Sequence, residues 1–181
     1  GGSVTVLEIA DRLMGRGVPH SISQYFLDLH RGNGVDIRLG TGVERIDGDG
    51  AVSGVTTSMG ERLDADMVVI GVGIIPETVL AEDAGLKVEN GIVVDEFCRT
   101  SATDIYAAGD VTSHFSHFAG RHIRLEAWQC AQNMAIAAAK VMCGEEAAYS
   151  EVPWMWSDQF DTNLQVAGLP DSWDEIVGRG D

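Results

Sequence analysis

Apolar residues along the chain follow several different spacings, and each spacing predicts a different element. Residues 4–9 are apolar and mostly β-branched, which is typical of a buried strand. Over 21–31 the apolar positions are three and four residues apart, which predicts a helix with Ser21 as its N-cap. Residues 35–39 are apolar again and complete a strand–helix–strand unit.

Short runs separated by glycine come next, and they predict an antiparallel meander. The expected strands are 43–46, 52–57 and 61–63. The continuous apolar run ADMVVIGVG (65–73) then predicts a buried strand. Beyond it we expect a short helix over 77–84 and two strands, at 91–95 and 104–108.

The last third of the chain contains the longest predicted helix. Residues 126–143 lack glycine and proline and are rich in alanine, and Gly144 follows as a helix stop. After a linker, residues 154–160 and 164–167 read as two more strands. A strand–helix–strand unit combined with a meander predicts an α/β nucleotide-binding architecture.

The net charge of the chain limits the kinds of partner that it can bind. The chain of 181 residues has 28 Asp and Glu against 12 Lys and Arg, a net charge of −16. Such a chain repels phosphate backbones and anionic headgroups, so we expect neither nucleic acid nor a membrane as partner. The three cysteines show no CxxC spacing, which favours a reducing compartment, the cytoplasm.

Candidate nucleotide-binding residues follow the first predicted strand. In a dinucleotide fold, a carboxylate placed like Glu8 accepts hydrogen bonds from the adenosine ribose and repels a 2′-phosphate, which favours NADH over NADPH. The alternative is a solvated carboxylate at a strand end. Arg12 and Arg16 could contact the adenine or phosphates of the nucleotide, or could be ordinary surface arginines.

Glycines mark two further candidate sites. Gly71, Val72 and Gly73 end the predicted strand 65–73, where missing side chains allow a ligand to approach the backbone, although a plain turn explains them as well. Gly109 would let the chain turn close to a ligand, and Asp110 could accept hydrogen bonds from a sugar or ribityl hydroxyl. Alternatively, Asp110 caps a turn.

The stretch RTSATDIYAAGDVT (99–112) resembles the second flavin-binding motif of the FAD-dependent pyridine nucleotide-disulfide oxidoreductase superfamily. Further segments occur in the order found in ferredoxin, putidaredoxin and rubredoxin reductases, and the resemblance covers essentially the whole chain. These segments are SVTVLEIADRLMGR (3–16), ADMVVIGVGIIPET (65–78), AGLKVENGIVVD (84–95), RLEAWQCAQNMAIAAA (124–139) and WSDQFDTNLQVAGLP (156–170).

The resemblance implies three parts of a longer protein. Residues 1–77 would be the C-terminal part of an NAD-binding domain, starting just before its second strand. Residues 78–148 would be the returning half of an FAD-binding domain, and residues 149–181 the beginning of a C-terminal interface domain. The implied fold class is α/β, with Rossmann-like nucleotide-binding layers, an antiparallel β-meander and the start of an α+β interface domain.

The resemblance also implies roles for the candidate residues. Asp110 would bind the flavin ribityl chain, Glu8 the NADH ribose, and Gly73 with its neighbours the nicotinamide half. At the start of the long helix, the residues facing the flavin ring would be Glu126, Ala127 and Trp128. A helix N-terminus carries partial positive charge, which would stabilise the anionic reduced flavin. The Asp110 turn and this helix start would therefore border one cleft. The alternative role of Trp128 is packing in the core.

The implied function is an NADH-dependent flavoprotein reductase that passes electrons through FAD to a ferredoxin or rubredoxin. No side chain is expected to act as a catalyst, because the cofactor carries the chemistry. His114, His117 and His122 have spacing too loose for a metal site. One alternative is an inactive fragment or a partial nucleotide-binding or interaction module. Another is a disulfide reductase relative, although WSDQ (156–159) stands where those enzymes carry His and Glu.

Overall fold

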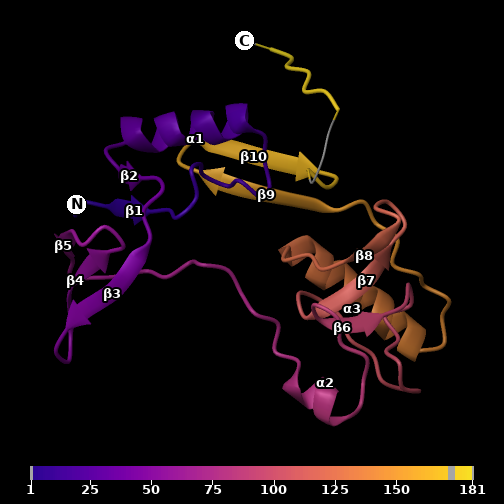
Figure 1. Cartoon of the computed structure of the whole chain (residues 1–181). Coiled ribbons are helices and arrows are strands. Elements are labelled where there is room, and N and C mark those ends of the chain that lie inside the picture. Colours follow the sequence, from indigo (N-terminus) through magenta and orange to yellow (C-terminus); the bar gives the residue numbers. More distant parts are fainter. Residues whose placement is uncertain (1, 171–173, 181) are drawn as a thin grey trace. The chain divides into compact units, whose positions relative to one another are not determined.

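A computed structural model describes residues 2–170 and 174–180 and divides them into two compact units (Figure 1). The first unit contains the described residues up to Val72 and those after Leu169, and the second is Gly73–Leu169. The division expected at 77/78 and 148/149 stays a prediction, and residues 1, 171–173 and 181 of its segments lie outside the described residues.

The first unit begins with the predicted strand–helix–strand arrangement. β1 (Thr5–Leu7) and β2 (Asp36–Arg38) pair in parallel, with Val6 opposite Ile37, and α1 (His20–Gly32) connects them. The helix buries Phe26 and Leu27 on one face. Ser21 is not the N-cap, because the Pro19 carbonyl already accepts the N–H groups of Ile22 and Ser23 and places Ser21 inside the first turn.

The antiparallel meander is confirmed. Its strands are β3 (Val43–Gly48), β4 (Val52–Thr57) and β5 (Arg62–Asp64), in the spatial order β3-β4-β5. The β3–β4 register shifts at two places, which marks bulges of the kind that strengthen twist.

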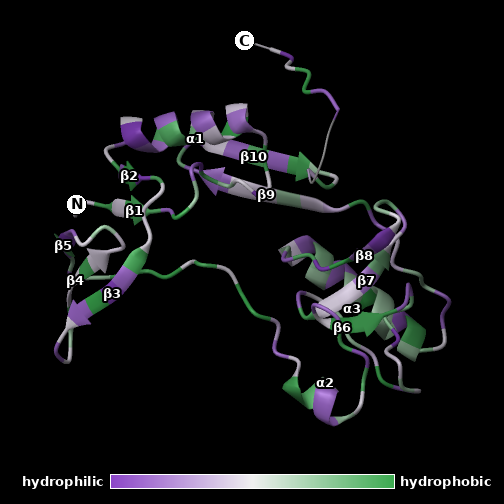
Figure 2. Cartoon of the chain, viewed as in Figure 1, coloured by the Kyte–Doolittle hydropathy of each residue, from purple (hydrophilic) through white to green (hydrophobic). Residues whose placement is uncertain are grey.

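The predicted strand 65–73 is wrong. The described chain is extended there but pairs with no strand, and Val69, Val72 and Ile75 are 86%, 88% and 93% exposed. Figure 2 shows apolar residues along this segment outside any helix or strand. A continuous apolar run meets the side-chain preference of a buried strand, but a strand also needs a hydrogen-bonding neighbour. The described strands provide only one backbone bond to this segment, from the Ala65 N–H to the Ser53 carbonyl at its first residue.

The second unit contains a mixed three-stranded sheet. β6 (Ile92–Val94) pairs in parallel with β7 (Thr112–Ser116), which pairs antiparallel with β8 (Arg121–Ile123). A short helix, α2 (Val79–Asp83), precedes them. The sequence pattern did not indicate β7 and β8 as strands, and the buried residues of β7 are all polar: Thr112, Ser113, His114 and Ser116.

The predicted strand 104–108 is also wrong. Only an isolated bridge between Arg99 and Tyr106 forms there. Asp104 has a φ of +63°, and the Ala107 N–H donates to the Cys98 carbonyl. The segment therefore turns back on 98–100 instead of joining the sheet.

The long alanine-rich helix is confirmed as α3 (Trp128–Met142), followed by Gly144 at a φ of +89°. The two predicted strands near 154–167 are confirmed as β9 (Trp154–Gln159) and β10 (Thr162–Ala167), which pair antiparallel. Together these elements confirm the α/β class. None of the described helices is both long and apolar enough to cross a membrane.

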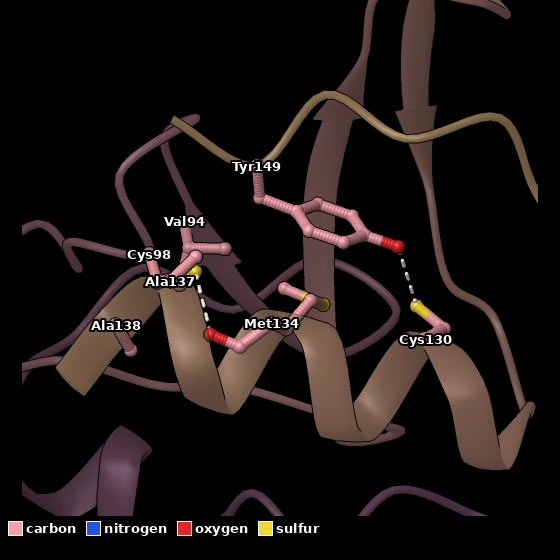
Figure 3. Close-up of a cluster of buried hydrophobic side chains, with 7 residues drawn as sticks. All are labelled: Val94, Cys98, Cys130, Met134, Ala137, Ala138 and Tyr149. Atoms are coloured by element: carbon pink, nitrogen blue, oxygen red, sulfur yellow. Dashed lines mark hydrogen bonds between the residues drawn. The ribbon is translucent and has the colours of Figure 1, made fainter. Parts of the chain in front are cut away.

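The core of the second unit lies on the inner face of α3 (Figure 3). It consists of Val94, Cys98, Cys130, Met134, Ala137, Ala138 and Tyr149. The Tyr149 hydroxyl donates to Cys130 Sγ at 3.2 Å. Burial raises the pKa of Cys98 to about 11 and also raises that of Cys130, so both thiols stay protonated at neutral pH and are poor nucleophiles.

His114 on β7 makes the stability of this unit depend on pH. Its side chain is buried against Tyr149, with ring centroids 5.3 Å apart, and its Nδ1 has no hydrogen-bond partner among the described residues. Burial, and secondarily His122, lower the pKa of His114. Because the unfolded chain then binds the proton more readily, stability is lost as the pH falls below about 6.5, the ordinary histidine pKa.

We therefore expect the free energy of unfolding to fall by up to about 1.4 kcal/mol per pH unit below that point, and to level off below the folded-state pKa. Urea unfolding at pH 7.5 and 5.0 measures this free energy at the two pH values. Tryptophan fluorescence follows the second unit, because three of the four tryptophans lie in 73–169. His114→Phe keeps a ring beside Tyr149 and should reduce the pH dependence. Equal pH dependence in both proteins would contradict the assignment.

Candidate functional site

The strongest candidate site in the second unit lies where the turn at Gly109 and Asp110 meets the start of α3. Gly109 is buried with a φ of +84°, and a Cβ at this position would stand 3.4 Å from the Cβ of Ala131. Thr112 holds the turn, because its N–H and Oγ1 donate to the Gly109 carbonyl at 2.9 and 2.7 Å. The structure therefore brings together the two features that the sequence expected to border one cleft.

Asp110 is half-buried at this junction. Its carbonyl accepts a hydrogen bond from Arg124 Nη1 at 3.4 Å. Its carboxylate accepts none from the side chains or backbone of the described residues, so both carboxylate oxygens can accept hydroxyl donors from a ligand.

The N-terminus of α3 is open to a ligand. Ala127 is its N-cap, in extended conformation, and provides no side-chain cap; the first turn contains no acidic residue. The first N–H groups of this 15-residue helix therefore lack side-chain acceptors. Together with the helix dipole they favour negative charge at this end.

Glu126 precedes the helix, and its carboxylate is engaged. Arg124 Nη1 lies 2.8 Å from Glu126 Oε1, and the Arg124 side chain is only 13% exposed. The sequence analysis missed Arg124, although it begins the segment RLEAWQ on which the resemblance partly rests.

Trp128, the first residue of α3, is 65% exposed, so it is not a core residue. Its ring meets Trp156 of β9 edge to face, with centroids 5.9 Å apart, and Trp156 stacks on Trp154 at 5.3 Å. Exposed aromatic surface thus lies beside the start of the helix.

In the first unit, Glu8 directly follows the carboxyl end of β1, as expected. Its Oε1 accepts the N–H of Ala10 at 2.8 Å, which orients the side chain. The other carboxylate oxygen accepts no hydrogen bond from the described residues and remains available for a ligand hydroxyl.

Arg12 is bound within the loop that follows Glu8. Its guanidinium donates to the carbonyls of Val18 at 2.8 Å and Gly15 at 2.6 Å, and to Ser23 Oγ at 3.4 Å. A cavity beside it of about 20 Å³ holds roughly one water, not a nucleotide. Arg16 is exposed and is the more accessible of the two arginines.

The structure does not gather Gly71, Val72 and Gly73 with other candidate residues. They lie in the exposed extended segment, across the boundary of the two units, and their role stays a prediction. The described residues contain no group of three or more His, Cys, Asp or Glu that could hold a metal ion.

Two protein-family models match the chain. One, described as pyridine nucleotide-disulphide oxidoreductase, matches residues 1–135, and the other, described as reductase C-terminal, matches residues 154–181. A ferredoxin–NAD(+) reductase component of an anthranilate 1,2-dioxygenase system from Burkholderia cepacia is 44% identical over all of this chain and 45% of its own length. Putidaredoxin reductase from Pseudomonas putida is 39% identical, over 98% of this chain and 43% of its own length.

Solved structures resemble the fold closely. A ferredoxin reductase from Rhodopseudomonas palustris superimposes with a TM-score of 0.94 at 40% identity, over 100% of this chain and 45% of that one. The reductase in a covalent putidaredoxin reductase–putidaredoxin complex gives 0.93 at 38% identity, over 98% of this chain and 43% of that one. The chain spans less than half the length of these relatives.

Proposed function

The chain belongs to the pyridine nucleotide-disulphide oxidoreductase family, and from this we propose that the whole protein is an NADH-dependent flavoprotein reductase that delivers electrons to a ferredoxin or rubredoxin. The observation that carries the proposal is the junction of the Asp110 turn with the open end of α3. The printed names of its relatives, ferredoxin–NAD(+) reductase and putidaredoxin reductase, support the same class of reaction.

The residues at the junction fit FAD. Gly109 lets the backbone approach a ligand, and the Asp110 carboxylate is free to accept hydrogen bonds from ribityl hydroxyls. Ala127, Trp128 and the preceding Glu126 would lie at the ring, where the positive end of α3 favours negative charge. When bound, FAD supplies the conversion of two-electron hydride chemistry into one-electron transfer.

For NADH, we assign the ribose contact to Glu8. Its free oxygen would accept ribose hydroxyls, and its charge would repel the 2′-phosphate of NADPH. Arg16 would contact the nucleotide from the loop, whereas Arg12 would act mainly by holding that loop against α1. Gly71, Val72 and Gly73 would let the nicotinamide half approach the backbone.

The segment WSDQ (156–159) favours electron delivery over disulfide reduction, because it stands where disulfide reductases of the superfamily carry His and Glu. Cys98 and Cys130 are buried with raised pKa values, and Cys143 is exposed. These cysteines form no reactive pair within the described residues. Three reduced cysteines also support the cytoplasm as the compartment.

The partner would dock near Trp128, which would then lie between the flavin and the iron centre of the partner. The net charge of −16 would repel an acidic ferredoxin, so the contact must rely on apolar and aromatic surface near the site or on basic residues elsewhere in the whole protein. The exposed rings of Trp128 and Trp156 provide such surface.

The function is tested by purifying the whole protein, recording its visible spectrum, and following NADH oxidation with a one-electron dye and then with a [2Fe–2S] ferredoxin. We expect a flavin spectrum and turnover with both acceptors. A colourless, inert protein would contradict the proposal, and NADPH-dependent turnover of a dithiol substrate would favour a disulfide reductase. The 181-residue chain assayed in parallel tests whether this segment alone is inactive.

Replacing Glu8 by Ala should raise the KM for NADH about tenfold, the cost of roughly one charged hydrogen bond, and narrow the preference over NADPH. Steady-state kinetics with both cofactors measures this. Asp11→Ala removes another exposed carboxylate from the same loop and should leave the preference unchanged. An unaltered NADH to NADPH ratio in the Glu8 variant would exclude the ribose role.

Replacing Asp110 by Ala should weaken FAD binding by about tenfold to a hundredfold, since a charged acceptor of ligand hydroxyls contributes about 1.5–3 kcal/mol. Titration of the apoprotein with FAD, followed by flavin fluorescence, gives the affinity. Asp110→Asn retains one acceptor oxygen and should give an intermediate value. Wild-type affinity in the Ala variant would show that this carboxylate does not contact the flavin.

A further inference from the structure

One half-buried guanidinium connects the separate segments that form the candidate flavin site. Arg124 follows β8 directly, and its side chain is 13% exposed. Its Nε donates to Asn90 Oδ1 at 3.3 Å, and its Nη1 donates to the Asp110 carbonyl at 3.4 Å. The same Nη1 forms an ion pair with Glu126 Oε1 at 2.8 Å. It thus links the turn before β6, the turn before β7 and the residue pair before α3.

The backbone around Arg124 leaves room for this side chain. Gly91 is buried with a φ of +120°, and a Cβ there would stand 3.2 Å from Arg124 Cδ and 2.7 Å from the Val111 carbonyl oxygen. Any side chain at position 91 would therefore displace both the arginine stem and the strand. The Arg124 side chain therefore occupies a defined space in the packed structure, unlike a flexible arginine on the surface that happens to lie near a carboxylate.

The charge of Glu126 explains why this link matters for a flavin. Glu126 stands two residues before the first residue of α3, beside the helix end that favours negative charge. An uncompensated carboxylate at this place would oppose any charge that develops on a bound ring. The Arg124 guanidinium at 2.8 Å offsets that charge and fixes the position of the carboxylate.

We propose that Arg124 is a positioning residue of the flavin site, which holds the Asp110 turn at a fixed distance from the start of α3 and offsets the charge of Glu126 beside the flavin. This inference rests on the proposed function, because it concerns the same site. It assigns two separable effects to one side chain. The tie to the Asp110 carbonyl controls flavin affinity, and the pair with Glu126 controls the reduction potential of the flavin.

The test uses the whole protein loaded with FAD and four variants of it. Three are the single variants Arg124→Lys, Arg124→Gln and Glu126→Gln, and the fourth is the double variant that combines Arg124→Gln with Glu126→Gln. Three quantities are measured for each: the FAD dissociation constant, the midpoint potential by equilibration with a reference dye, and the melting temperature of the apoprotein by circular dichroism.

Arg124→Gln should weaken FAD binding about tenfold and lower the potential, because Glu126 is then uncompensated beside the flavin. A tenfold loss in the preference for reduced over oxidised flavin corresponds to about 30 mV for this two-electron couple. Glu126→Gln should raise the potential, and the double variant should return to the wild-type potential while its FAD affinity stays low. Arg124→Lys retains the charge, so it should keep the potential and lose only part of the affinity.

A double variant with the same lowered potential as Arg124→Gln would overturn the proposal, and so would an unchanged potential in Glu126→Gln. If Arg124→Gln does not fold, the Glu126→Gln and Arg124→Lys variants still decide the electrostatic part. A wild-type protein that takes up no FAD refutes the proposed function instead, and this result is obtained before any variant is compared.

Discussion

The close packing of Gly109 against Ala131 is the contact on which the second unit depends. It brings a turn between two strands within van der Waals distance of the first turn of α3. No larger residue fits this turn without strain, because Gly109 has a positive φ and is buried. This close approach therefore also places Asp110 near the positive end of the helix.

Side chains of the core also contact the residues that form this junction. Cys130 lies in the first turn of α3 and accepts a hydrogen bond from Tyr149. The hydroxyl of Thr112, which holds the Gly109 turn, lies 3.5 Å from Met134 Sδ. The thiols in this core serve packing, since burial raises the pKa of both Cys98 and Cys130. Redox chemistry at this site would therefore belong to a bound cofactor and not to cysteine.

The first unit also contains a candidate carboxylate, Glu8, that neighbouring residues hold in place. Glu8 stands at the carboxyl end of a parallel strand, where such sheets bind ligands, and the N–H of Ala10 orients it. The loop after it is held by Arg12, as the junction in the second unit is held by Arg124. In both units a guanidinium binds backbone carbonyl oxygen, two for Arg12 and one for Arg124, in the segment near the candidate carboxylate.

The sequence by itself determined the elements that depend on local patterns. The spacing of apolar residues identified α1, the meander and α3. The short motif at Gly109 and Asp110 indicated the candidate site of the second unit, which stays a prediction. These features are predictable because helix periodicity, glycine turns and strand-end carboxylates are encoded within a few residues.

Only the tertiary structure decided which segments pair and which charges meet. Residues 65–73 have the composition of a strand, yet a strand needs a neighbour that local sequence cannot name, and β7 is a strand despite its polar residues because β6 and β8 flank it. Arg124 is 34 residues from Asn90 and 14 from Asp110 along the chain, so these two hydrogen bonds exist only after folding. Strand pairing and such hydrogen bonds are long-range properties, and for that physical reason they could not be read from the sequence.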